Sequence, residues 1–487
     1  MVFAPRRGVS HLPTGETMTS TLADELRGID LRDRRLNRRS QALLETLAAN
    51  PEASINGACD TWSETQAAYR FFDNPAVTPE AILRPHALAT LARMRNHPVV
   101  LHVQDTTELD FSRHPPRDAR CLDQEHRLGL YVHSYLAVTP DRQVPGVPGP
   151  DFFDRGPATP GLSGKRKSLP ISWKESQRWL DGYHAACELA AACPQSQVVS
   201  VADREADIYD LFLSAAAAKA ESGGGAEWIV RSKQVRCTPE RDGEAGGASY
   251  RKVRDEVSAL PLFTTRVLEL PTTPKRKGRT ATLELRVKTV TVKSPHLRSH
   301  LDNVVPNVVS VREVNGPGDG TDVGWWLLTS LPVATVDEVV KVIDCHVARW
   351  TVELFFRAWK TGCRVEDIRL ETLARLKNSL AMYAIIAWRI LALTYQARVE
   401  PATPCTESFS TEEWQMVWRM VKKQPLPSQP PTLAEMVVMV ARLGGYDNRK
   451  SDGPPGPQAL WMGLRRVRDF VLAWKSLRQT PDDDVCK

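Results

Sequence analysis

The sequence predicts an α/β protein in which an α/β core is flanked by helical domains at both ends. Short apolar runs alternate with helical segments in the middle of the chain, whereas the segments before and after this region have helical patterns only. A length of 487 residues is enough for several domains and a large buried core. We therefore expect a helical domain at 1–85, an α/β domain at 86–375 and a helical region at 376–487.

The composition indicates a folded protein with a mild preference for anionic partners. The net charge of +6 favours a polyanion, although this excess is small for 487 residues. The nine cysteines include no C-x-x-C pair, so neither a disulfide framework nor a zinc site is indicated, and we expect a reducing compartment. The most apolar stretch, Leu380–Tyr395, is short for a membrane span and contains Arg389, which predicts a core helix and no membrane contact.

The N-terminal region contains an arginine-rich helical segment. Six arginines lie between Arg27 and Arg39, and four leucines supply an apolar stripe. Such a density of cations is typical of phosphate contacts, for which Arg35 and Arg39 are candidates. Because four acidic residues are interleaved with the arginines, a self-neutralised surface helix is an equally good interpretation.

Two apolar strands of the core are each followed by an aspartate. Val99–Val103 leads to Asp105, and Val198–Ala202 leads to Asp203. Ligands gather outside the carboxyl ends of strands in buried sheets. Two carboxylates there, with a third from a helix, could hold two Mg²⁺ or Mn²⁺ ions. The competing interpretation is that each aspartate caps a helix or a turn.

A later segment supplies a third acidic residue. It contains His346, Arg349, Glu353 and Lys360, which are separated by 3, 4 and 7 residues. These spacings would bring the four side chains to one face of a single α-helix. An acid beside three groups that can bind phosphate suits metal-assisted phosphodiester chemistry. The alternative is a solvated stripe, since Arg349 and Glu353 also form an ordinary i,i+4 ion pair.

The order of the expected elements is that of an RNase H-like domain. They are strands at 99–105 and 128–148, a helix at 172–192, a strand at 198–203, a helix at 205–218, a strand at 227–231 and the helix of Glu353. Further helices are expected at Leu376–Val399, Leu433–Leu443 and Ala459–Leu477.

Between the last core strand and the helix of Glu353, the chain alternates Thr, Val, Leu and Arg. This pattern predicts an antiparallel β insertion over about residues 232–322. Its basic tip contains Lys275, Arg276 and Lys277 and continues to Arg279. The tip is either a nucleic-acid contact or the solvated end of a hairpin.

A series of motifs, found in the same order, resembles the landmarks of the DDE cut-and-paste transposases of bacterial insertion sequences, of the transposon-five type. They are D-T-T-E-L from Asp105, G-x-Y-V-H-S from Gly129, D-R-E-A-D-I from Asp203, I-V-R-S-K from Ile229, W-x-L-L-T-S from Trp325, and the stretch from Arg349 through A-W-K-T-G at 358–362. The resemblance covers residues from about 22 to 475, which is nearly the whole chain.

The resemblance implies an acidic triad of Asp105, Asp203 and Glu353 that binds two divalent ions. It also implies an N-terminal domain that binds the transposon ends and a C-terminal region that forms a homodimer. The expected enzyme nicks double-stranded DNA at these ends, forms and reopens a hairpin, and joins the ends to target DNA.

The same resemblance predicts DNA contacts for further residues. Arg231, Arg349 and Lys360 match phosphate-binding positions, and Trp325 matches a tryptophan that stacks on a flipped base, although it could also be a core residue. His346 stands where the family has tyrosine. Since histidine changes charge near pH 6.5 and tyrosine does not, we expect an altered pH profile.

Two other functions are compatible with parts of this pattern. A two-carboxylate glycosidase would also need paired acids, but it would not need the arginines and the lysine around them. The other is a catalytically decayed, transposase-derived DNA-binding repressor; the intact acidic triad argues against it, whereas the departure at His346 keeps it open.

Overall fold

The structure is a computed structural model and describes residues 22–123, 126–154, 171–222, 224–241, 249–270, 277–449 and 452–479. The chain forms two compact units whose segments interleave in the sequence. Apart from the first residue, unit 1 contains residues 94–105 and 157–350, and unit 2 contains residues 2–93, 106–156 and 351–487. Strand β1 (Val99–Asp110) belongs to both, because its first part lies in unit 1 and its last part in unit 2. The predicted domain boundaries near 85 and 375 stay a prediction.

Unit 1 is built on a mixed sheet. Its parallel strands are β1, β5 (Gln197–Ala202) and β6 (Glu227–Arg231). These strands are nearly continuous apolar runs because both of their faces are buried. The sheet continues with antiparallel strands in the order β12 (Gly324–Thr329), β11 (Asn307–Glu313), β10 (Arg279–Thr289) and β9 (Thr264–Leu270).

The segment expected to be an antiparallel insertion therefore contains strands that extend the sheet of β1, β5 and β6. It also contains a separate two-stranded sheet and a short helix, which the alternating pattern did not predict. These elements are β7 (Cys237–Arg241), β8 (Tyr250–Lys252) and α7 (Val253–Ser258).

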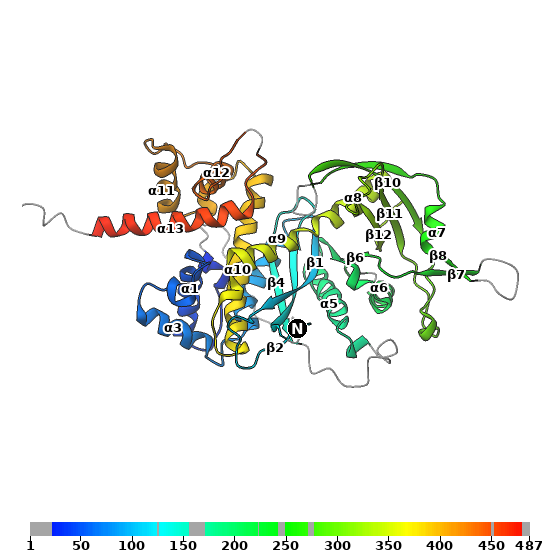
Figure 1. The fold of residues 1–487 in the computed structure, drawn as a ribbon, viewed down its shortest axis with the longest axis horizontal. Helices are drawn as coiled ribbons and strands as arrows, with labels where there is room; N and C mark the ends of the chain where they lie inside the picture. Colours follow the sequence, from blue (N-terminus) through cyan, green and yellow to red (C-terminus); the bar gives the residue numbers. More distant parts are fainter. Residues whose placement is uncertain are drawn as a thin grey trace, which may run out of the picture. The chain divides into compact units, whose positions relative to one another are not determined.

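Three longer helices belong to unit 1. Helix α5 (Gln177–Ala192) packs against β5 and against α6 (Tyr209–Ser222), and α5 and α6 lie side by side in Figure 1. Helix α8 (Val336–Ala348) begins with a capping box between Thr335 and Glu338. It is tied to the sheet at two places, by Lys341 to Gln197 at 2.7 Å and by Arg266 to Asp344 at 2.6 Å.

Unit 2 contains the helices at both ends of the chain and a small set of strands. The N-terminal helices are α1 (Arg34–Ala49), α2 (Ile55–Ala58), α3 (Trp62–Phe72) and α4 (Pro79–Met94). The strands are the end of β1, β2 (Arg120–Cys121), β3 (Leu128–Val138) and β4 (Gly146–Phe153). The later helices are α9 (Thr351–Arg357), α10 (Leu373–Val399), α11 (Thr411–Lys422), α12 (Leu433–Leu443) and α13 (Pro457–Gln479).

Helix α10 is the central core helix of unit 2. Its 27 residues, three more at the N-terminal end than the predicted helix Leu376–Val399, make it long and apolar enough to cross a membrane. However, 83% of its most hydrophobic window is buried inside the protein. Asn378 donates to the carbonyls of Phe72 and Val77, at 3.0 and 2.8 Å, and thereby joins α10 to the end of α3 and the loop after it.

A buried ionic network anchors the first described residues to this core. Glu25 accepts two hydrogen bonds from Arg93, at 2.9 and 3.1 Å, and its Oε2 lies 2.6 Å from Nδ1 of His86. The backbone N–H of Val147 donates to Nε2 of His86 at 3.0 Å, so the imidazole is neutral and donates from Nδ1 to Glu25. The Arg93 guanidinium lies 4.5 Å from the ring centroid of Trp388 on α10.

Candidate active site

Asp105 lies within β1, which continues to Asp110 and is therefore longer than the strand predicted to end at 105, whereas Asp203 directly follows the adjacent strand β5. Strands β1 and β5 are parallel with Val103 opposite Val201, and two further residues lead to the aspartates. Asp203 also caps the 3₁₀ turn that follows β5, because its Oδ1 accepts the N–H of Glu205 at 2.7 Å. Asp203 is therefore both the acid that follows β5 and the cap of the turn after it.

Two arginines lie beside this pair of carboxylates. Arg349, at the C-terminal end of α8, donates from Nη1 to Oδ2 of Asp105 at 3.0 Å. Arg231 ends β6, and its pKa is lowered by burial and by the positive charges of Arg204 and Arg349, whereas the negative charge of Asp203 raises it. Asp105 and Asp203 thus lie near Arg349 and Arg231, whose guanidinium groups can bind phosphate.

Trp325 and His346 contact each other in the same unit. Their ring centroids are 4.9 Å apart in an edge-to-face arrangement, and Trp325 is half-buried. His346 is buried, and burial together with the charges of Arg349 and Arg231 lowers its pKa to about 3. The pKa of His346 thus lies well below the ordinary value near 6.5, because burial and the positive charges of two arginines disfavour the charged imidazole.

The neighbouring tryptophan has a different environment. Trp326 is also half-buried, but its ring lies 5.6 Å from the guanidinium of Arg254. Strand alternation separates the two tryptophans, and Trp325 is the one that faces His346.

The segment from His346 to Lys360 is not the single α-helix that the spacing predicted. Helix α8 ends at Ala348 and α9 begins at Thr351, because the N–H of Trp350 bonds to Val347 in a tightened 3₁₀-type turn. After α9, residues Ala358–Gly362 form a π-helical turn closed by the N–H of Cys363 on the carbonyl of Ala358 at 2.9 Å. The spacings of 3, 4 and 7 therefore do not define one helix face.

Packing accounts for the π-helical turn. Trp359 is fully buried and stacks on Phe355, with ring centroids 5.7 Å apart. Gly362 lies directly under the ring of Trp461, where a Cβ atom would approach the ring to 2.9 Å. The A-W-K-T-G motif thus owes its tryptophan and its final glycine to packing within unit 2.

Glu353 and Lys360 belong to unit 2. Glu353 is exposed in the first turn of α9. Lys360 is half-buried with Nζ 3.9 Å from Glu366, and burial lowers its pKa, whereas Glu366, Glu108 and Glu353 oppose this shift. In the parts of the chain that the structure describes, no three histidine, cysteine or acidic residues form a group that could hold a metal ion.

The arginines of α1 form an exposed face. Arg34, Arg35, Arg38 and Arg39 are exposed, whereas Leu43, Leu44 and Leu47 are buried on the opposite side. The interleaved acids have local partners: Asp24 pairs with Arg27, Asp30 accepts the N–H of Arg32, and Asp33 caps the helix. Asp24 thus neutralises one arginine of the segment, and the phosphate contacts of Arg35 and Arg39 stay a prediction.

The predicted basic tip is only partly described. Lys275 and Arg276 lie outside the described residues, and Lys277 is exposed. Arg279 instead pairs with the buried Glu313, with Nε and Nη2 each 2.9 Å from a carboxylate oxygen. Its inclusion in a DNA-contacting tip is therefore corrected, because this ion pair ties β10 to β11.

Asp207 is a structural residue to which the sequence analysis assigned no role. Its buried carboxylate accepts the backbone N–H groups of Lys233 and Gln234, at 2.7 and 2.6 Å, and it also pairs with Arg236. It thereby shapes the loop that directly follows Arg231. The second aspartate of the D-R-E-A-D motif was the available signal, since a buried acid needs partners.

Comparison with known proteins identifies the class. Models of transposase DNA-binding, of the transposase DDE domain and of the transposase Tn5 dimerisation domain match residues 18–77, 224–389 and 385–481, respectively. The chain is therefore a DNA transposase of the DDE class, with DNA-binding and dimerisation regions. It belongs to the Tn5-like DDE transposases, which confirms the resemblance seen in the sequence.

The matching family models cover only part of the expected acidic triad. The DDE-domain match includes Glu353, whereas Asp105 and Asp203 precede it. Among solved structures, the chain is similar to a piggyBac transposase in a synaptic complex with hairpin DNA, determined by cryo-EM. The two share 11% sequence identity over 97% of this chain and 76% of that chain, with a TM-score of 0.35.

Proposed function

We propose that the chain cleaves transposon ends and joins them to target DNA through an acidic triad of Asp105, Asp203 and Glu353. The observation that carries the proposal is that β1 and β5 are adjacent and parallel, with Val103 opposite Val201, and that Asp105 and Asp203 each follow two residues after this pair. We further propose that β1, β5, β6 and the helix of Glu353 form an RNase H-like core, with the segment of about residues 232–322, which contains β9 to β11, inserted between β6 and that helix.

The donor set suits Mg²⁺ or Mn²⁺. Carboxylate oxygens are the ligands that these ions prefer, and neighbouring strand ends can hold two ions roughly 3.5–4 Å apart. One oxygen of Asp105 is bonded to Arg349, so Arg349 has to share or release this carboxylate when an ion binds. Bound divalent ions would supply neutralisation of charge at phosphorus and a more acidic attacking hydroxyl.

The remaining residues would position DNA for a series of in-line displacements at phosphorus. Water attacks first and frees a 3′-hydroxyl, which then attacks the opposite strand to close a hairpin. Water reopens the hairpin, and the 3′-hydroxyl finally attacks target DNA. Arg231, Arg349 and Lys360 would hold phosphate oxygens during these steps.

A metal-dependent nicking assay on transposon-end DNA tests the proposal, and end binding without nicking would instead support a decayed repressor.

Trp325→Ala should slow hairpin closure by about 5- to 150-fold more than first-strand nicking, because base stacking is worth about 1–3 kcal/mol. The motivation is that Trp325 is half-buried and faces His346. The measurement is a gel assay that resolves nicked, hairpin and reopened ends. Trp326→Ala is the matched control and should not separate the two steps; equal slowing of both steps by Trp325→Ala would show that Trp325 is a core residue.

His346→Tyr, which restores the residue of the family, should raise hairpin yield by a factor that does not vary between about pH 6 and 9. His346 is neutral throughout this range because its pKa is lowered to about 3. Hairpin yield is measured against pH for both proteins, with thermal unfolding as a check that the larger ring fits. A gain confined to alkaline pH would show that His346 carries a charge in the DNA complex.

Arg35→Gln combined with Arg39→Gln should lower the slope of log K against log salt for end binding by about 1.8, as expected for two lost phosphate contacts. The two arginines are exposed on the same side of α1. The control is the double variant with lysine at both positions, which keeps the charge and should keep the slope. An unchanged slope in the glutamine variant would make α1 an ordinary surface helix.

A further inference from the structure

Arg349 occupies a carboxylate oxygen that a divalent ion at Asp105 would need. It donates from Nη1 to Oδ2 of Asp105 at 3.0 Å, and the two side chains are only 12% and 15% exposed. Both residues belong to unit 1. Because a guanidinium and a divalent cation compete for the same carboxylate, this bond opposes metal binding.

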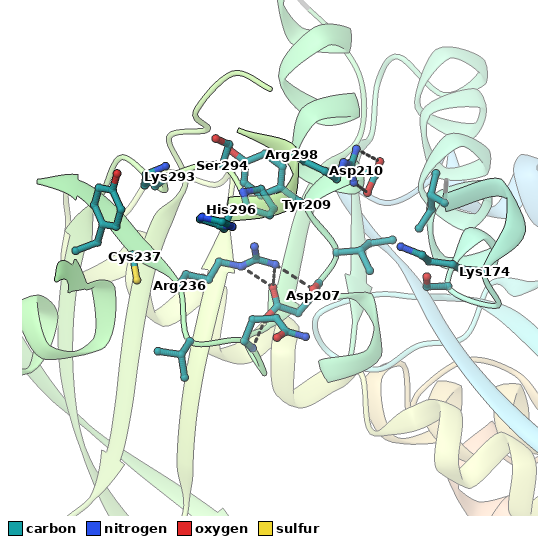
Figure 2. A pocket seen from close by; sticks show the side chains of 17 residues that line it. Lys174, Asp207, Tyr209, Asp210, Arg236, Cys237, Lys293, Ser294, His296 and Arg298 are labelled. Carbon is teal, nitrogen blue, oxygen red and sulfur yellow. Dashed lines mark hydrogen bonds and ion pairs between the residues drawn. The ribbon is translucent and has the colours of Figure 1, made fainter. Parts of the chain in front are cut away.

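The contact between Arg349 and Asp105 differs from a second arginine–aspartate pair of unit 1. Arg298, on the wall of a cavity, makes two hydrogen bonds to Asp210, each of 2.7 Å, as Figure 2 shows. Arg349 holds Asp105 through one hydrogen bond, from Nη1. A bidentate pair is stronger than a single bond, so Arg349 is better suited than Arg298 to exchange its carboxylate for another partner.

Arg349 also adds to the positive potential around the aspartates. Burial lowers the pKa of Arg231, and so do the positive charges of Arg204 and Arg349, whereas Asp203 raises it. Several guanidinium groups therefore act on one another at this place. Their positive charge disfavours a divalent cation until an anion arrives.

DNA supplies such an anion and offers Arg349 another partner. A guanidinium can bind a phosphate through two parallel N–H···O bonds. Moving Arg349 from Asp105 to a phosphate removes a competing cation from the carboxylate and brings a negative charge beside it. Both changes favour the binding of a divalent ion.

We propose that Arg349 is a positioning residue that couples metal binding to DNA binding. Without DNA, it holds Asp105 and keeps the affinity for divalent ions low. When a DNA phosphate takes the guanidinium, Oδ2 of Asp105 is released from Arg349 and can bind an ion. By linkage, the ion raises the affinity for DNA by the same factor. The inference rests on the proposed function, because it requires Asp105 to be a metal ligand.

The test measures binding of Mn²⁺ to the full chain by electron paramagnetic resonance, without DNA and with a saturating duplex. The duplex ends at the transposon terminus, so that it has no flanking strand to cleave, and Mn²⁺ bound by the duplex alone is subtracted. In the wild type, DNA should raise the Mn²⁺ affinity about 5- to 150-fold, the usual range for coupled sites. An unchanged affinity would overturn the proposal without the need for any variant.

Arg349→Gln should bind Mn²⁺ without DNA about fivefold or more tightly than the wild type does, and DNA should then add less. The loss of a bond that only supports the fold would not raise the affinity. Arg349→Lys keeps the charge and should stay close to the wild type without DNA. An affinity of Arg349→Gln equal to or below that of the wild type would overturn the proposal.

Arg204→Gln is the matched control for charge. It removes a positive charge near Arg231 but leaves the bond between Arg349 and Asp105 in place. We expect a smaller gain in Mn²⁺ affinity than in Arg349→Gln. An equal gain would show that the general charge of the site sets the affinity, and it would overturn the role proposed for Arg349.

Asp105→Asn separates a failure of this inference from a failure of the proposed function. If Asp105 is a ligand, Asp105→Asn weakens Mn²⁺ binding when DNA is present. Retained Mn²⁺ binding would refute the proposed metal site and the coupling with it. Weakened binding in Asp105→Asn, together with no gain in Arg349→Gln, would refute the coupling alone.

Discussion

Glu353→Gln should abolish cleavage of transposon ends while leaving end binding intact. The substitution keeps the shape of the side chain and removes a charge proposed to bind a metal ion. The loss should exceed the roughly 10- to 100-fold that changes outside the direct ligands cost. Glu353 is exposed in the first turn of α9, so losing its interaction with the helix dipole should cost only about 0.3–1 kcal/mol of stability. Nicking in Mg²⁺, end binding and thermal unfolding are the measurements.

Glu366→Gln is the matched control for this prediction. Glu366 also lies near Lys360, and the oxygen of a glutamine at this position can still accept the N–H of Asp110. The same charge is therefore lost beside the same lysine, but outside the proposed triad. We expect this variant to retain nicking. Wild-type nicking by Glu353→Gln, or equal loss in both variants, would refute the assignment of Glu353.

Glu25→Gln should lower the free energy of unfolding by about 3–5 kcal/mol, because it removes the charge that pairs with a largely buried network. Glu25 is 7% exposed and accepts two hydrogen bonds from Arg93. Chemical denaturation measures the effect. Asp24→Asn is the control, since Asp24 pairs with the exposed Arg27 and its loss should cost at most about 1 kcal/mol. Similar losses in both variants would mean that the buried network adds no stability of its own.

The same residue should make unfolding sensitive to acid. Burial by itself would raise the pKa of Glu25, but the hydrogen bonds and charges of its partners lower it below the ordinary value of 4.5. A lowered carboxyl pKa contributes stability that is complete above the ordinary value and is lost as the pH falls toward the folded-state pKa. The difference in stability between wild type and Glu25→Gln should therefore shrink in acid. A difference that is constant with pH would show that Glu25 is not the titrating group.

Elements that depend on local pattern could be predicted from the sequence. The strands before Asp105 and Asp203 are recognisable as apolar runs, and α12 has the predicted bounds Leu433–Leu443. The exposed arginine face of α1 follows from helical spacing, and the order of the motifs identified the family. Local pattern suffices in these cases because neighbouring residues determine which side chains are buried.

Other features depend on residues far apart in the chain, and only the tertiary structure shows them. The break between α8 and α9 lies at a tightened turn closed by Trp350 and Val347, and the π-helical turn places Gly362 under the ring of Trp461, a residue far along the chain. The neutral state of His346 results from burial near Arg231, and the pairing of Asp105 with Arg349 joins residues from opposite parts of the sequence. The sequence by itself therefore determined the class of protein and its candidate acids. The protonation and ion pairing of the groups around Asp105 and Asp203 depend on long-range burial and charge, which no local pattern contains.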